Sequence, residues 1–427
     1  MTGYRWKILA LMACGSFLNY VDRASLSIAA PFVMKEFHFS PAQMGIIFSS
    51  FFFSYALFCF VGGYLSDVYG PKKTIAFAMI AWSLFAGAPA IAWGFGSLLV
   101  FRVLFGAGEG PIGSVSNKLV NNWFPATERA KAKGISDSGM SMGAALSGPI
   151  VGLIAVRFGW RISFVLLTIL GFLWTAFWFK IASDRPRQSS KVSPQELEKI
   201  EQGQTLSVNV TEKKPLFYYI KQPVILSIIV VFFATNYVTY FFLTWFPSYL
   251  VMARNLSIKN MSIVSIIPWL LGALGYVIGG SLSDHLVKRG TNPIAARKVV
   301  ISIFMTGAAV SVGLCGFASS VTAAVTLMSI GIFCAYLATP CYWATIQDSV
   351  RSESVGGVGG FVHFLSNLAG IFAPSITGFI VQGTGHFTSA FVATGVMALV
   401  GALVVAIFAK PIGYTSHQAA AVGASKA

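Results

Sequence analysis

Long apolar stretches separated by short polar segments make up almost the whole of this chain. A helix needs about 20 apolar residues to cross the hydrocarbon core of a bilayer, and twelve stretches reach that length. They lie near residues 8–33, 43–66, 74–94, 97–122, 131–156, 162–182, 223–251, 261–283, 299–318, 320–347, 356–381 and 387–409. The pattern therefore predicts an all-α membrane protein with twelve transmembrane helices.

The first stretch also has features of a signal peptide, because Arg5 and Lys7 precede its apolar run. However, Asp22 and Arg23 interrupt that run, and eleven further apolar stretches follow it. We therefore interpret the first stretch as a transmembrane helix.

One long polar segment, residues 184–222, divides the stretches into six and six. It predicts an N-terminal six-helix bundle in residues 1–183, a cytoplasmic linker in 184–222, and a C-terminal six-helix bundle with a short cytoplasmic tail in 223–427. The two halves also share short motifs. Gly62-Gly63-Tyr64-Leu65-Ser66-Asp67 recurs 217 residues later as Gly279-Gly280-Ser281-Leu282-Ser283-Asp284, and Pro149 and Gly152 match Pro374 and Gly378 at an offset of about 225. Two matches at similar offsets predict duplicated, pseudo-symmetric bundles.

The composition supports a membrane protein, since 56% of the 427 residues are hydrophobic and only 10% are charged. Soluble domains carry about a quarter charged residues, so a soluble enzyme is excluded. The five cysteines lie in apolar stretches without the spacing of metal ligands, and no nucleotide-binding loop is present. We expect no cofactor, no metal and no use of ATP. A membrane enzyme or a sensor on the same fold is the alternative class, but no nucleophile-and-base set supports an enzyme.

The basic residues indicate the orientation in the membrane. With the amino terminus placed inside, 22 of the 30 Lys and Arg fall in inside loops, five fall outside and three lie within spans. By the positive-inside rule this predicts a multi-pass membrane protein with both termini in the cytoplasm. The same bias explains the net charge of +16 without a nucleic-acid partner.

Ionisable residues inside a membrane are costly and are functional candidates by default. The six within the predicted spans are Asp22, Arg23, Arg102, Glu109, Lys118 and Asp137. Arg102 and Glu109 are two helical turns apart and share one helix face, whereas Asp22 and Arg23 point about 100° apart. Guanidinium groups suit a carboxylate ligand, and buried carboxyls can carry protons. The alternative is that these charges only pair with one another and hold helices together.

Two of the six are interpreted separately. Lys118 lies near the cytoplasmic end of its helix, where a structural role and a gating role are both open. Asp137 begins the fifth predicted helix, where a gate or cap residue is expected rather than a coupling site.

The segment Gly63-x-x-x-Asp67-x-x-Gly70-Pro71-Lys72-Lys73 resembles the signature of the major facilitator superfamily. Within it the chain resembles the anion:cation symporter family, which includes bacterial galactonate, glucarate and hexuronate carriers and sialin. That resemblance is carried by Tyr20-Val21-Asp22-Arg23, Arg102 to Glu109-Gly110-Pro111, Trp123-Phe124-Pro125 and Phe242-Leu243-Thr244-Trp245-Phe246-Pro247. The galactonate carrier is the member that we expect to be most similar. The resemblance to bacterial carriers implies that the membrane is the bacterial inner membrane.

The resemblance implies a role for particular residues. In the galactonate carrier, the acids that match Asp22 and Glu109 carry proton coupling, and residues that match Tyr20, Arg23, Tyr55, Arg102 and Trp343 line the sugar-acid site. Three matching positions differ in this chain, where Met140 replaces a glutamine, His363 an asparagine and Tyr342 a threonine. Tyr342 and His363 are expected in the site, with fewer amides available for sugar hydroxyls.

Gates and close helix contacts are also predicted. Asp67 and Asp284 end pseudo-equivalent helices beside basic loops that include Lys72 and Lys73, so these four residues are expected to form cytoplasmic gate contacts between the halves. The pairs Gly139-x-x-x-Gly143 and Gly148-x-x-x-Gly152 are predicted to permit close approach of neighbouring helices.

Together these features predict a monomeric, proton-coupled secondary transporter that imports a small organic anion by alternating access. A sugar acid such as a hexonate, aldarate or hexuronate is the expected substrate. An aromatic or other small monocarboxylate remains open, and so does an uncoupled facilitator or an antiporter.

Overall fold

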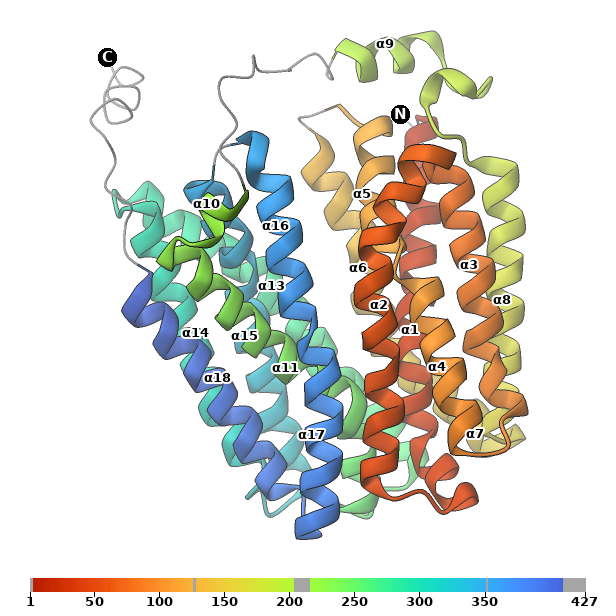
Figure 1. The fold of residues 1–427 in the computed structure, drawn as a ribbon, viewed down its shortest axis with the longest axis vertical. Helices are drawn as coiled ribbons and strands as arrows, with labels where there is room; N and C mark the ends of the chain where they lie inside the picture. Colours follow the sequence, from red (N-terminus) through yellow and green to blue (C-terminus); the bar gives the residue numbers. More distant parts are fainter. Residues whose placement is uncertain (1–2, 126–127, 203–215, 351, 410–427) are drawn as a thin grey trace.

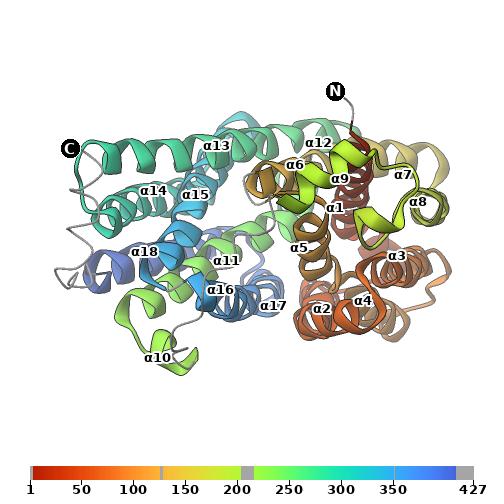
Figure 2. The same cartoon turned by 90° about the horizontal axis from the view of Figure 1, so that it is seen from above.

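The computed structural model describes residues 3–125, 128–202, 216–350 and 352–409, and within these ranges it contains helices and no strands. The helices stand side by side in two groups, one for each half of the sequence (Figure 1). The first group contains α1 (Tyr4–Phe37), α2 (Pro41–Tyr69), α3 (Pro71–Gly87), η1 (Ala88–Ile91), α4 (Phe95–Glu109), α5 (Ile112–Trp123), α6 (Arg129–Ser147), η3 (Gly148–Gly152), α7 (Leu153–Phe158) and α8 (Trp160–Ile181). The two groups lie beside each other when the molecule is seen from above (Figure 2).

The second group begins after the polar segment that the sequence analysis places between the halves. It contains α11 (Pro223–Met252), α12 (Ile258–Val264), α13 (Ile266–Lys288), α14 (Pro293–Cys315), α15 (Val321–Ser349), α16 (Ser352–Asn367), α17 (Ala369–Thr384) and α18 (Thr388–Phe408). Short helices occupy the described parts of the polar segment, namely η4 (Pro186–Gln188), α9 (Pro194–Gln202) and α10 (Leu216–Ile220).

Eleven helices or helix runs are long and apolar enough to cross a membrane, from Pro41–Cys59 to Thr388–Phe408. The first predicted span forms α1 and is absent from these eleven, because Asn19, Asp22 and Arg23 in its middle lower its hydropathy. Those polar side chains are buried inside the protein, so α1 can still pack among the spanning helices. The helical fold is confirmed, and eleven spans with α1 are consistent with twelve.

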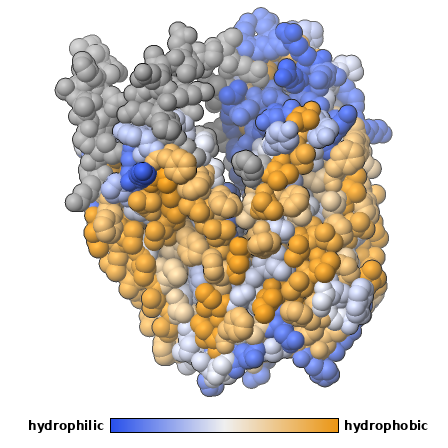
Figure 3. Space-filling model, in the orientation of Figure 1, coloured by the Kyte–Doolittle hydropathy of each residue, from blue (hydrophilic) through white to orange (hydrophobic). Residues whose placement is uncertain are grey.

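The surface has the pattern of a protein that crosses a bilayer. Hydrophobic residues form a broad band across the middle of the face in Figure 3, and hydrophilic residues gather toward its two ends. Large apolar side chains such as Phe77, Trp93 and Val277 are more than 60% exposed. Lipid would cover these side chains without the cost that water imposes.

The linker helix α9 is attached to the first group. Glu196 accepts hydrogen bonds from the backbone N–H groups of Tyr4 (2.8 Å) and Arg5 (3.1 Å) at the start of α1. Because the first N–H groups of a helix have no partner within it, the carboxylate acts as an N-terminal cap. Elsewhere in the segment, Arg187 hydrogen-bonds Glu201 and lowers the pKa of that carboxyl. The end of the molecule that carries α9 is called the linker face below, and the other end the opposite face.

Glycines bring α1 and α6 together as predicted. A Cβ atom added to Gly139 would lie 2.1 Å from the carbonyl oxygen of Ala13, and one added to Gly143 would lie 2.2 Å from that of Phe17. Such distances leave no room for a side chain, so the prediction for this pair is confirmed. The second predicted pair also makes close contacts, because a Cβ on Gly148 would lie 2.5 Å from the carbonyl oxygen of Ser262.

The two groups of helices meet closely near the opposite face. Among the described residues, the hydrogen bonds between the groups all lie there and join α2 to α17: Ala42 to Gln382 (3.2 Å) and Ser375 to Ser49 (2.7 Å) and to the Gly45 carbonyl. Gly378 completes this contact, because its Cβ would lie 2.5 Å from the Pro41 carbonyl oxygen. We call these residues of α2 and α17 the α2–α17 seal.

Candidate functional site

Buried charges gather near the middle of the first group. α1 carries Asp22 (2% exposed) and Arg23 (5%), and α4 carries Arg102 (4%) and Glu109 (0%). Small residues allow α2 to approach α4, since a Cβ on Gly106 would lie 2.2 Å from the Phe51 carbonyl oxygen. These three helices therefore enclose the charges without contact with bulk water.

The structure brings Arg23 and Glu109 together as an ion pair. The Arg23 Nε donates to Glu109 Oε1 at 2.8 Å, and its Nη2 contacts the same oxygen. The guanidinium also lies over the rings of Tyr20 (5.0 Å), Tyr55 (4.6 Å) and Phe51 (5.2 Å). Cation–π contacts strengthen when they are desolvated, so these rings stabilise the charge that Glu109 neutralises.

Arg102 has a different environment. Its guanidinium lies 4.7 Å from the centre of the Phe51 ring and 5.2 Å from that of Phe105, and it makes no ion pair with any residue that the structure describes. Its Nε is buried and has no hydrogen-bond partner within the described ranges. A buried cation without a counter-ion is costly, and an anionic ligand would remove that cost.

Asp22 lies apart from the ion pair. Its Oδ2 accepts a hydrogen bond of 3.1 Å from the indole Nε1 of Trp82 on α3. Its Oδ1 is buried and unpartnered among the described residues. The two acids that the sequence analysis treated together thus have different partners, an arginine for Glu109 and an indole for Asp22.

The predicted site residues of the second group lie around Phe232 of α11. Its ring centre lies 5.9 Å from that of Trp343 and 5.9 Å from that of His363, and these two rings are also 5.9 Å apart. Tyr342 is fully buried, and its hydroxyl lies 2.6 Å from that of Thr235. Trp343 and His363 thus form an aromatic cluster with Phe232, and the Tyr342 ring also lies 5.1 Å from that of Phe232 while its hydroxyl is bound to Thr235.

Sequence reasoning missed a set of amides in the second group. Tyr240 of α11 donates a hydrogen bond to the amide oxygen of Asn367 at the end of α16, and its ring lies 4.3 Å from that of Phe52 on α2. One turn earlier on α11, Asn236 donates to Ser366 at 3.2 Å. Asparagines in apolar spans were the available signal, and they place amide groups where the second group faces the first.

The four predicted gate residues lie near the linker face. Asp67 pairs with Lys118 of its own group, and Asp284 pairs with Arg297 of its own group at 2.8 Å. The side chains of Lys72 and Lys73 make no ion pair with a described residue, although Asp184 accepts a hydrogen bond from the Lys72 backbone N–H at 2.7 Å. In this arrangement the two acids hold contacts within their groups.

Asp284, which ends the second copy of the repeated motif, belongs to a wider cluster around Arg297. Arg297 contacts Ser283 at 2.5 Å and reaches Asp348 at 3.4 Å. On the first group, Lys133 and Asp137 of α6 pair with each other at 2.5 Å. Asp137 therefore lies on the body of α6, about two turns from its start, and is paired with Lys133 one turn earlier.

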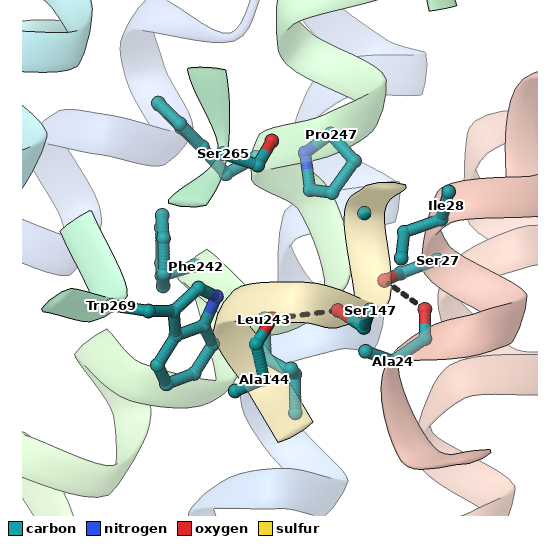
Figure 4. Close-up of a pocket in the computed structure, with 12 residues that line it drawn as sticks. Ala24, Ser27, Ile28, Ala144, Ser147, Phe242, Leu243, Pro247, Ser265 and Trp269 are labelled. Atoms are coloured by element: carbon teal, nitrogen blue, oxygen red, sulfur yellow. Dashed lines mark hydrogen bonds between the residues drawn. The ribbon is translucent and has the colours of Figure 1, made fainter. Parts of the chain in front are cut away.

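A small pocket lies where the groups meet (Figure 4). Its walls are largely apolar and include Ile28, Phe242 and Trp269. The hydroxyls of Ser27 and Ser147 point toward it but donate to carbonyls of their own helices, at 2.8 and 2.7 Å. With no charged residue in its lining, this pocket is unsuited to an anion.

Comparison with known proteins agrees with this arrangement. The chain belongs to the Major Facilitator Superfamily, whose sequence profile matches residues 12–374. It is 47% identical over 407 residues to the hexuronate transporter of Bacillus subtilis, covering 95% of this chain and 94% of that protein. It is 35% identical to a probable galactarate/D-glucarate transporter of Escherichia coli K12, with 92% of each chain covered.

A solved structure shows the same fold. A bacterial homologue of the human lysosomal transporter Spinster, in an inward-facing and unoccupied conformation, matches with a TM-score of 0.78 at 18% identity and covers 96% of this chain and 98% of its own. The all-helical, two-bundle fold class is thus confirmed, and a count of twelve spanning helices is consistent with it.

One expectation about the relatives was wrong. The D-galactonate transporter of Escherichia coli O6:H1 is only 29% identical, over 93% of this chain and 94% of its own, so it is less similar than the hexuronate transporter.

Proposed function

We propose that this protein is a proton-coupled symporter that imports a hexuronate or a closely related sugar acid. The observation that carries the proposal is the buried guanidinium of Arg102, which makes no ion pair with a described residue. A small carboxylate would supply that ion-pair partner. The names of the relatives, which are hexuronate and galactarate/D-glucarate transporters, support a sugar acid over an aromatic monocarboxylate.

In this proposal Arg102 receives the substrate carboxylate first. Arg23 is the second cation, and it becomes available when Glu109 releases it. Tyr20, Tyr55, Trp343 and His363 provide stacking surface and hydrogen-bonding groups around the sugar acid, and Tyr342 supports that wall from behind. The amide of Asn367 adds a group that can bind hydroxyls, although Met140 and His363 have replaced other amides.

Proton coupling follows from competition for Arg23. The carboxylate of Glu109 and that of the substrate are alternative partners for one guanidinium. Protonation of Glu109 weakens its ion pair with Arg23, so it favours substrate binding, and by linkage the substrate promotes proton uptake equally. Asp22 is the second coupling acid, and it carries its proton apart from the pair. Symport results if movement between the two faces requires both the proton and the anion.

Orientation is also part of the proposal. In this proposal the protein lies in the inner membrane of a bacterial cell with its linker face in the cytoplasm, and the bias of basic residues toward the inside loops supports that orientation. The α2–α17 seal then closes the outer side, and this structure corresponds to an inward-facing state. The bundles 1–183 and 223–427 move against each other around segment 184–222, within a monomer. Cysteines at Ser190 and Asn255 should react from opposite sides, and labelling of residue 190 from outside intact cells would refute this topology.

The gate residues then change partners during transport. Asp67 and Asp284, with Lys72 and Lys73 beside them, form contacts between the bundles when the cytoplasmic side closes. Asp67→Asn should therefore increase the cytoplasmic accessibility of residues between the bundles. An unchanged labelling rate in Asp67→Asn would remove Asp67 from the gate.

The test of the substrate site is binding measured by calorimetry on purified protein. Loss of a buried, charge-assisted contact costs about 1.5–3 kcal/mol, so Arg102→Ala should weaken D-glucuronate binding roughly 10- to 150-fold. Arg157 of α7 is exposed and lies over Phe158 near the opposite face, so Arg157→Ala is a matched control that should bind as wild type does. Unchanged affinity in Arg102→Ala would overturn the assignment of the site.

A further inference from the structure

Trp82 connects a buried acid to α3, a helix that otherwise carries only the gate residues Lys72 and Lys73 among the residues of the proposed mechanism. It lies in the middle of α3, is fully buried, and donates its only hydrogen bond to Asp22 of α1 at 3.1 Å. Aromatic residues in apolar spans are usually core residues, and the sequence analysis did not single out this one. Its hydrogen bond distinguishes it from a residue that only fills space.

We propose that Trp82 is a positioning residue for proton coupling, whose indole N–H fixes the Asp22 carboxyl and determines which of its oxygens takes the proton. The proposal rests on the proposed function, in which Asp22 is a coupling acid.

The hydrogen-bonding chemistry of indole indicates which oxygen of Asp22 takes the proton. An indole N–H donates a hydrogen bond and has no lone pair to accept one. The proton of a neutral carboxyl therefore cannot lie on Asp22 Oδ2 and point at Trp82. It binds Oδ1 in preference, because a carbonyl oxygen accepts the hydrogen bond from Trp82 better than a hydroxyl oxygen does, and Oδ1 is buried and has no partner among the described residues. Trp82 thus leaves one oxygen of Asp22 for the proton and keeps the other occupied.

The surrounding packing holds the indole in place. A Cβ added to Gly108 of α4 would lie 2.7 Å from the backbone nitrogen of Trp82, so α3 and α4 touch directly at this level. Gly108 precedes Glu109, which means that Trp82 is packed beside the backbone of the helix that carries the other acid. A shift of α3 against α4 would therefore disturb both acids.

Several helices that carry ionisable groups pack against α1, the helix of Asp22. Glu109 of α4 is within electrostatic range of Asp22, and Arg23 follows it on α1. The other helices packed against α1 contribute further ionisable groups: Tyr55 and Cys59 on α2, Lys118 on α5, Arg129, Lys133 and Asp137 on α6, Arg161 and Lys180 on α8, and Tyr237 and Tyr240 on α11. None of these makes a hydrogen bond or an ion pair with Asp22 in the described structure, so Trp82 is its specific partner.

The test replaces the indole by a ring that lacks the N–H. Trp82→Phe should bind D-glucuronate within about threefold of wild type, because Trp82 has no role in holding the anion. Without the donor, the charged form of Asp22 is less favoured and releases its proton less readily. In liposomes with an imposed pH gradient, the pH of half-maximal uptake should therefore rise by about one unit, since a hydrogen bond to a charged group is worth about tenfold in proton affinity.

A matched control is available on the same bundle. Trp174 of α8 is also buried, and its indole donates at 2.9 Å to the carbonyl of Leu11 on α1. Trp174→Phe removes an indole N–H that, like that of Trp82, donates to α1, but its acceptor is a carbonyl and not an acid. This variant should therefore leave the pH profile of uptake unchanged. An unchanged profile in Trp82→Phe, or the same shift in both variants, would overturn the proposal.

Two further measurements keep the result interpretable. In wild-type protein labelled with ¹⁵N at tryptophan, one indole N–H resonance should titrate with the midpoint of uptake, and Asp22→Asn should abolish that titration. The absence of any titrating indole would overturn the role of Trp82 even if Trp82→Phe does not fold. Proton-driven accumulation that persists in Asp22→Asn would instead refute the proposed coupling role of Asp22.

Discussion

The α2–α17 seal should depend on the absence of a side chain at Gly378. In Gly378→Ala, the added Cβ would lie 2.5 Å from the Pro41 carbonyl oxygen and 3.2 Å from the Cα of Ala42. Ordinary van der Waals contact begins at 3.4 Å, so α2 and α17 must separate by about 0.9 Å at this point. Both neighbouring atoms belong to the backbone and cannot move away alone. The substitution therefore acts against the state in which the seal is closed.

The size of the effect of Gly378→Ala follows from the free-energy cost of overpacking. Extra methyl groups in close-packed interiors cost about 1–3 kcal/mol. The clash is made only while α2 and α17 are in contact, so the same free energy changes the ratio of closed to open molecules. Since about 1.4 kcal/mol is tenfold, that ratio should fall roughly 5- to 150-fold.

Cysteine labelling from the outer side measures the change in the ratio of closed to open molecules. The reporter is Ser27→Cys in a background without the five native cysteines, because Ser27 lines the pocket between the two groups of helices and is 2% exposed. A membrane-impermeant maleimide should react with it 5- to 150-fold faster in Gly378→Ala. Gly383→Ala on the same helix, where an added Cβ meets nothing within 4 Å, should leave the rate unchanged. Equal rates in Gly378→Ala and Gly383→Ala would refute the reasoning.

Two further substitutions test contacts that support the site. Asn367→Ala leaves the buried hydroxyl of Tyr240 without its acceptor and should lower the free energy of unfolding by about 1–3 kcal/mol, seen as a fall in Tm, whereas Tyr240→Phe should cost less. Equal losses would show that the unpaired hydroxyl is not the cause. Glu196→Ala removes the cap of α1 and should destabilise the protein by about 0.5–2 kcal/mol in thermal unfolding. Glu198→Ala, an exposed change on the same helix, should have no effect, and a similar loss there would contradict the capping role.

The spanning helices could be predicted closely because a bilayer imposes a length. The stretch expected near residues 223–251 forms α11 over Pro223–Met252, and that near 387–409 forms α18 over Thr388–Phe408. The close contact at Gly139 and Gly143 was also predictable, since small residues one turn apart mark a face where backbones approach. These features depend on local sequence alone.

The pairing of the buried charges was less predictable. Arg23 and Glu109 are 86 residues apart, and their ion pair depends on how α1 and α4 are rotated toward each other. The sequence analysis left open whether the buried charges pair with one another or serve a ligand. The structure contains both situations, with Arg23 paired and Arg102 unpaired among the described residues.

Some partners gave almost no signal in the sequence. Trp82 lies in an apolar stretch where any large residue could fill the core, so its hydrogen bond to Asp22 depends on the packing of α3 against α1. The partner of Asn367 could not be assigned either, because Tyr240 lies on a different helix 127 residues away. Contacts of this kind require the three-dimensional arrangement.

The most direct test of the central claim is accumulation of D-glucuronate in liposomes that contain the purified protein. With an inward proton gradient and no other driving force, internal substrate should rise above its external concentration, and collapse of the gradient by a protonophore should return it to equilibrium. The double variant Asp22→Asn, Glu109→Gln should reach equilibrium only. Wild-type uptake that stops at equal concentrations despite the gradient would contradict proton coupling and leave a facilitator, and accumulation by the double variant would exclude these two acids.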